Sequence, residues 1–143
     1  MNDRGPALTL RVLVFALLIV GMLGVGTELL LLEHWEDPWQ QAPLVVLAVG
    51  VCSVTWEAVM GTRASSLCLQ IAMTLFVIVG CVGLWLHFKG NIEFEREMYP
   101  TLKGLPLVWQ ALKGATPAVA PGMLAFIGLL GLAYTLFPPS SDS

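Results

Sequence analysis

Four long apolar runs, separated by more polar connections, constrain what this chain can fold into. The runs cover about residues 9–32, 43–60, 67–86 and 118–137. Each is close to the roughly 20 helical residues needed to cross about 30 Å of hydrocarbon. Because lipid offers the backbone no hydrogen bonds, and the runs are longer than barrel strands, each run is predicted to be a helix. We therefore predict an all-α fold: a four-helix transmembrane bundle that forms a single membrane domain over residues 1–143.

The composition excludes two broad classes of protein. Hydrophobic residues make up 57% of the chain and charged residues 12%, whereas a soluble globular domain has about 25% charged residues. The seven Lys and Arg residues are scattered, so no basic stripe is available for nucleic acid.

The first run exceeds the roughly 7 to 15 residues of a signal-peptide core and lacks an A-x-A cleavage signal, so we expect it to remain as the first span.

Positive charges near the first spans predict the orientation of the chain. Arg4 and Arg11 precede or open the first run, Arg63 follows the second, and the connection 33–42 has no Lys or Arg. The positive-inside rule then places both termini in the cytoplasm and the connections 33–42 and 87–117 outside it. The longer connection carries four Lys or Arg residues mixed with acids, but long connections are less telling for topology.

The connection 87–117 is too long for a simple turn and contains one amphipathic segment. Apolar residues recur there at i, i+3, i+4 and i+7, which predicts a short extracytoplasmic interfacial helix between the third and fourth spans. Its apolar stripe would face the headgroup boundary or cap the bundle, and consists of Leu105, Val108, Trp109 and Leu112. The segment 92–99 alternates too briefly to separate strand from helix. Four tryptophans are expected as interfacial anchors at the outer surface: Trp35, Trp39, Trp85 and Trp109.

Ionisable residues inside the spans divide into two layers. Glu28 and Glu57 lie roughly 15 Å apart in depth, so they cannot share one ligand. Glu57 belongs to an inner layer with Arg11, Arg63 and Gln70, where the simplest interpretation is a carboxylate paired with a nearby Arg or Gln.

The outer layer is the candidate polar or ligand-binding cluster, and it holds both histidines. Its members are Glu28, Glu33, His34, Glu36, Asp37, His87, Glu93, Glu95 and Glu97. Imidazoles and carboxylates can bind a divalent metal, with His34, His87 and Glu33 the best candidates, but the spacing matches no ligand motif. A solvated acidic rim is the simpler interpretation, and a proton-handling site is a further alternative. No cofactor is required by the sequence.

Motifs for covalent catalysis are absent, and no catalytic residue is predicted. The chain has no G-x-S-x-G and no glycine-rich phosphate loop, and its three cysteines lie in apolar runs as packing residues. Small residues such as Gly80, Gly83, Gly128 and Gly131 should let spans pack closely within the bundle, with a homodimer interface as the alternative.

Three stretches carry a resemblance to a known group of proteins. They are L-L-L-L-E-H-W-E-D-P-W-Q, G-N-I-E-F-E-R-E-M-Y-P, and A-L-K-G-A-T-P-A-V-A-P-G-M-L-A-F-I-G-L-L-G-L-A-Y-T. The chain resembles a family of small uncharacterised bacterial four-span integral membrane proteins over about residues 28–135. Since that family has no assigned activity, the resemblance implies the fold and a location in the bacterial inner (cytoplasmic) membrane.

Together these patterns favour a non-catalytic accessory or partner-binding subunit. It would sit in the lipid bilayer and contact other membrane protein subunits through its acidic, tryptophan-rich extracytoplasmic rim. The alternative is a metal- or proton-handling site at that rim, serving transport or redox chemistry.

Overall fold

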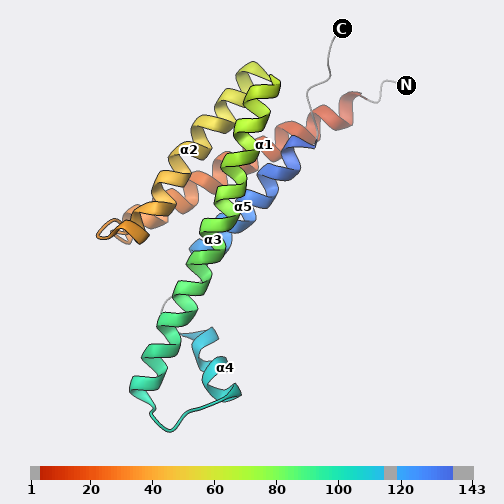
Figure 1. Ribbon diagram of the computed structural model, residues 1–143. Coiled ribbons are helices and arrows are strands. Elements are labelled where there is room, and N and C mark those ends of the chain that lie inside the picture. The colour runs from red at the N-terminus through yellow and green to blue at the C-terminus, as the bar shows by residue number, and fades with distance from the viewer. Residues whose placement is uncertain (1–3, 115–118, 137–143) are drawn as a thin grey trace.

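The computed structural model describes residues 4–114 and 119–136, and every regular element in that part of the chain is a helix (Figure 1). The helices are α1 (Arg4–Leu31), α2 (Pro38–Met60), α3 (Arg63–Met98), α4 (Leu105–Lys113) and α5 (Val119–Thr135). The all-α prediction is thus confirmed for the described residues. Three helices are long and apolar enough to cross a membrane: α1 over Thr9–Leu31, α2 and α3. With 17 residues α5 is shorter, and the predicted limits of the fourth span, 118 and 137, lie outside the described residues.

The turn between α1 and α2 is shorter than the predicted connection 33–42, because α2 already begins at Pro38. The Asp37 carboxylate accepts hydrogen bonds from the backbone N–H groups of Trp39 and Gln40, at 2.8 and 2.9 Å, and so caps the helix. Proline is well suited to the first position of a helix, where its missing N–H has no partner to lose. An acidic residue of the predicted outer cluster therefore sets the start of α2.

α3 continues well past residue 86, where the third span was predicted to end. Its 36 residues make it about 54 Å long at 1.5 Å per residue, and in Figure 1 its far part extends beyond the other long helices. Residues 87–98 contain no proline and are rich in Lys, Glu, Arg and Met, which favour helix. The helix ends at Met98 because Tyr99 precedes Pro100, and a residue before proline disfavours helical backbone. The ambiguous segment 92–99 is thus helical up to Met98.

α4 runs back along this extension of α3 in the opposite direction. Arg96 of α3 lies near the start of α4 at Gly104, whereas the Asn91 side chain donates a hydrogen bond to the Ala111 carbonyl near its end, at 3.1 Å. α4 packs through Leu107 and Ala111, which are buried. The predicted stripe of Leu105, Val108, Trp109 and Leu112 faces away and stays exposed. We call α4, the loop before it and residues 87–98 of α3 the hairpin.

The four longer helices pack in a closed order, α1 on α2, α2 on α3, α3 on α5 and α5 on α1. Their shared core is apolar and includes Leu18, Val54, Met73, Phe76 and Ile127. The closest backbone approach joins α3 to α5. A Cβ added to Gly80 would lie 2.5 Å from the backbone nitrogen of Ala125, and one added to Gly128 would lie 2.7 Å from the Met73 carbonyl oxygen. Small residues thus allow the close helix packing that the sequence predicted.

The glycine contact between α3 and α5 can be tested with two substitutions in the same helix. Gly80→Ala should lower the free energy of unfolding by about 1–3 kcal/mol, because its methyl group meets backbone that cannot move aside. Gly90→Ala is the matched control, since no atom lies within 4 Å of the added Cβ, and it should be neutral or stabilising by up to about 1 kcal/mol. Unfolding of the detergent-solubilised protein by denaturant measures both. Equal stabilities of the two variants would contradict this packing.

Candidate functional site

The most completely built polar site in the described residues surrounds the carboxylate of Glu57, near the end of α2. Glu57 is only 2% exposed. Its Oε2 accepts a hydrogen bond from the Ser65 hydroxyl at 2.6 Å, and its Oε1 accepts from the Ser66 hydroxyl at 3.0 Å. The Arg11 guanidinium donates to Oε1 at 3.3 Å. Two helices other than its own therefore supply the donors that a buried carboxylate requires.

The link between α2 and α3 brings these groups together. Gly61 adopts a left-handed conformation (φ 55°) at the end of α2, and Thr62 immediately caps α3. The Ser65 N–H donates to the Thr62 hydroxyl at 3.1 Å, while the Thr62 N–H donates to the Ser65 hydroxyl at 2.9 Å. The last turn of α2 thus lies beside the first turn of α3. Glu57 is placed at the positive end of the α3 dipole, which favours a negative charge.

Arg11 connects this site to α1 and α5. Its side chain is only 13% exposed, and its guanidinium carbon lies 4.4 Å from the centre of the Tyr134 ring in α5. Tyr134 in turn packs against Phe15 of α1, with ring centres 6.5 Å apart. A cavity of about 420 Å³ adjoins the pair and has Val12 and Met60 in its walls. We call Arg11, Glu57, Ser65, Ser66 and Tyr134 the Glu57 network.

The Glu57 network matches the sequence analysis in part. Glu57 does pair with an arginine of the predicted inner layer, and that arginine is Arg11. Gln70 instead donates to the Thr135 hydroxyl at 3.4 Å, and Arg63 is exposed at the start of α3. The sequence patterns single out neither the two serines nor Tyr134. The signal in the sequence was Thr62-x-x-Ser65, the spacing of a capping box, which places both serines in the first turn of a helix.

The acidic residues of the α1–α2 turn serve mainly local structure. Asp37 caps α2, and the Glu36 N–H donates to the Gln40 side chain at 2.9 Å. Glu33 is exposed and has a positive φ of 52°, which lets the chain turn after α1. The Gln41 side chain closes the turn by donating to the Trp35 carbonyl at 3.1 Å. These contacts fit a solvated rim.

The two histidines of the predicted outer cluster come from different elements, the α1–α2 turn and α3. His34 in the turn lies close enough to His87 of α3 for their charges to interact. Glu28 is half-buried, and Glu93 pairs with Lys89 on the surface of α3 at 3.7 Å. Within residues 4–114 and 119–136, no three His, Cys, Asp or Glu side chains come together in a way that could hold a metal ion. The candidates His34, His87 and Glu33 therefore do not assemble as a set of three.

One face of α3 carries polar atoms that remain unsatisfied. His87, Asn91 and Glu95 follow at i, i+4 and i+8, and Asn91 is bonded to α4. Nδ1 of His87 and Oε2 of Glu95 are buried and have no hydrogen-bond partner among the described residues. Buried orphan atoms of this kind are rare in proteins. Both residues are among the nine candidates of the outer cluster, and no pattern in the sequence separates them from the rest.

Comparison with known protein families, curated proteins and solved structures finds no match to this chain.

The buried Glu57–Arg11 salt bridge should contribute far more to the free energy of unfolding than the exposed Glu93–Lys89 pair. Glu57→Leu should lower the free energy of unfolding by about 3–5 kcal/mol, because it leaves the Arg11 charge buried without its carboxylate. Adding Arg11→Met should recover part of that loss, since no charge is then stranded. Chemical denaturation in detergent measures both.

The matched control is Glu93→Gln, which breaks the exposed pair with Lys89 and should cost at most about 1 kcal/mol. If Glu57→Leu were as mild as this control, the Glu57 network would not be holding the helices together.

Proposed function

We propose that this protein is a non-catalytic accessory subunit of a membrane assembly, and that the hairpin binds a partner membrane protein. The observation that carries the proposal is the exposed apolar face of α4. Leu105 is 83% exposed, Trp109 62% and Leu112 65%. Large apolar side chains gathered on one face of an extramembrane helix are typical of an interaction surface.

The direction of α4 favours a protein partner over a lipid surface. A helix that lies on a membrane runs in the membrane plane, with its apolar face toward the acyl chains. α4 instead runs back along α3, and its apolar face extends from the level of Asn91 to that of Arg96. The N-terminal end of α4, beside Arg96, is therefore farther from the apolar part of α3 than its C-terminal end, beside Asn91. A partner helix that docks along α4 could cover the whole face.

The proposed anchor is a four-span arrangement. With 17 residues, α5 would cross about 25 Å, close to the hydrocarbon thickness, and it packs against α3 and α1. The distribution of Arg4, Arg11 and Arg63 supports cytoplasmic termini, so the hairpin would stand outside the cytoplasm. The location that we propose for this arrangement is a bacterial inner membrane.

Neighbouring surfaces support a partner anchored in the same membrane. The tryptophans of the α1–α2 turn, Trp35 and Trp39, are exposed, and so is Trp85 at the base of the hairpin. The proximity of His34 to His87 places the turn at that same base. Exposed indoles at the membrane end and an apolar helix face above it would give a continuous surface for a second membrane protein.

Site-specific photo-crosslinking in native membranes tests the proposal. A photoreactive residue at position 105 or 112 should give a discrete adduct with another membrane protein, whereas one at the paired, exposed Lys89 should give none. Trp109→Ala should reduce adduct formation about tenfold or more, because a tryptophan that becomes buried in an interface commonly dominates the binding energy. Adducts with lipid alone, adducts of twice the mass of this chain, or equal adducts from position 89 would contradict the proposal.

A second candidate function is proton handling, favoured by the orphan atoms of His87 and Glu95. Both groups can gain and lose a proton, and they lie eight residues apart on α3, about 12 Å. One small ion could not touch both, so water would have to connect them.

Proton flux into liposomes containing the purified protein tests this alternative. His87→Gln and Glu95→Gln should each abolish the flux, while Glu93→Gln on the exposed side of the same helix should leave it unchanged. Wild-type protein that passes no protons under an imposed gradient would rule the alternative out.

A further inference from the structure

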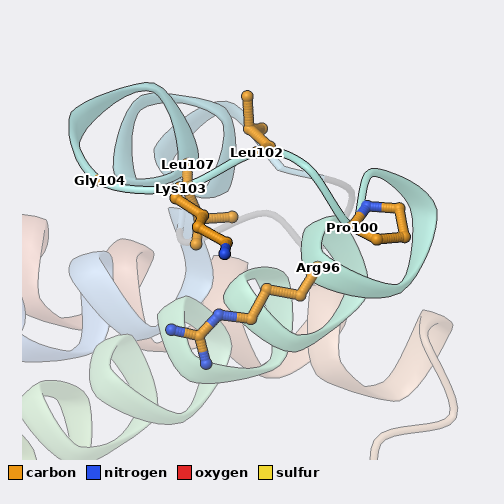
Figure 2. Close-up of a pocket in the computed structure, with 6 residues that line it drawn as sticks. All are labelled: Arg96, Pro100, Leu102, Lys103, Gly104 and Leu107. Carbon is orange, nitrogen blue, oxygen red and sulfur yellow. The ribbon is translucent and has the colours of Figure 1, made fainter.

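A pocket at the tip of the hairpin combines positive charge with apolar walls. It has a volume of about 480 Å³ and is lined by Arg96, Pro100, Leu102, Lys103, Gly104 and Leu107 (Figure 2). In Figure 2 the charged ends of Arg96 and Lys103 lie on the same side of the loop, and the lysine nitrogen is directed toward the guanidinium. No acidic residue is among the lining side chains, although Glu93, Glu95 and Glu97 lie nearby in the sequence.

The Lys and Arg side chains of the hairpin differ in whether they have an interaction partner. Lys89 pairs with Glu93, and Lys113 lies over the Trp109 ring at 5.4 Å from its centre. Neither Arg96 nor Lys103 has an ion pair or a side-chain hydrogen bond with any residue in the described part of the chain. The two unpaired cations are the two that line the pocket. Like charges held together without a counter-charge are unfavourable, and an anion between them would relieve that repulsion.

The start of α4 adds further positive potential. Gly104 precedes the helix and supplies no side-chain cap, and α4 has nine residues. The first N–H groups of a helix have no partner within the helix, and the helix dipole is positive at that end. Gly104 is itself part of the pocket wall, so these groups adjoin the two cations.

We propose that the tip pocket binds a small organic anion, with one carboxylate or phosphate group attached to a short apolar body. The anionic group would lie between Arg96 and Lys103, and the apolar body against Pro100, Leu102 and Leu107. Carboxylate and phosphate match the fork of an arginine, which can donate two parallel hydrogen bonds. The volume is within the roughly 300–1,000 Å³ of small-molecule sites. This site is independent of the apolar face of α4, which points elsewhere.

Calorimetric titration of octanoate into the full-length protein in phosphatidylcholine nanodiscs tests the site. Arg96→Gln and Lys103→Gln should each weaken octanoate binding about tenfold or more, because each removes a charge-assisted hydrogen bond. Both side chains are exposed, so these variants should remain folded. Lys89→Gln is the matched control: it removes one positive charge from the same hairpin but not from the pocket, and should leave the affinity within about twofold.

Two further titrations test whether the pocket recognises the anionic group, and where the natural anion comes from. Octanol, which has the same chain without the charge, should bind about tenfold or more weakly than octanoate. The octanoate titration is then repeated in phosphatidylglycerol nanodiscs. Weaker binding of octanoate in these nanodiscs means that the lipid headgroup competes for the pocket and is the natural source of the anion. Unchanged binding means that the natural source is a free anion. Absence of octanoate binding to the wild type, equal binding of octanol, or equal weakening by Lys89→Gln would overturn the proposal.

Discussion

Burial of the Glu57 carboxylate is the constraint on which the arrangement of the helices depends. A carboxylate removed from water costs several kcal/mol unless donors and an opposite charge surround it. Here Arg11 of α1 and two serines of α3 supply them, and Tyr134 of α5 covers the arginine. The donors come from α1 and α3, so Glu57 is satisfied only when these two helices are in register with α2. Apolar packing alone would tolerate small rotations of any of these helices.

α3 carries this constraint from one end of the molecule to the other. Its first turn is bound to Glu57, its middle contacts α5 at Gly80 and Gly128, and its far part holds α4. These three regions rest on different physics. Charge and hydrogen bonding fix the first, close backbone contact the second, and the Asn91 bond together with burial of Leu107 the third. Substitutions in the hairpin should leave the packing around Glu57 intact, because Glu57 contacts the first turn of α3 and not its far part.

Much of the fold could be predicted from hydrophobic run lengths, and most of the site could not. The helical class followed from the backbone requirement in lipid, and an Arg or Gln partner for Glu57 followed from the cost of an unpaired charge, although the sequence did not single out Arg11 among the candidates. Element ends were less accessible, because they depend on single residues. Asp37 starts α2 before the apolar run begins, and α3 continues for as long as no proline interrupts it. The α4 stripe of Leu105, Val108, Trp109 and Leu112 was recognised, yet its orientation was set by Asn91, which hydropathy does not register.

Residue types alone indicated a site among the acids of the outer rim. The hydrogen bonds and ion pairs of the structure indicate other residues, those that still have no partner. Asp37 and Glu93 already have partners, so they have little capacity left for a ligand. Within the part of the chain that the structure describes, His87 and Glu95 have buried atoms without a hydrogen-bond partner, and Arg96 and Lys103 have charges without an ion pair beside a pocket. All four belong to the hairpin, as does the exposed face of α4. An element can retain so many unsatisfied groups because the Glu57 network stabilises the protein elsewhere, and functional surfaces are commonly drawn from such regions. The longer helices thus form the packed part of the protein, and the hairpin carries these groups together with the exposed face of α4.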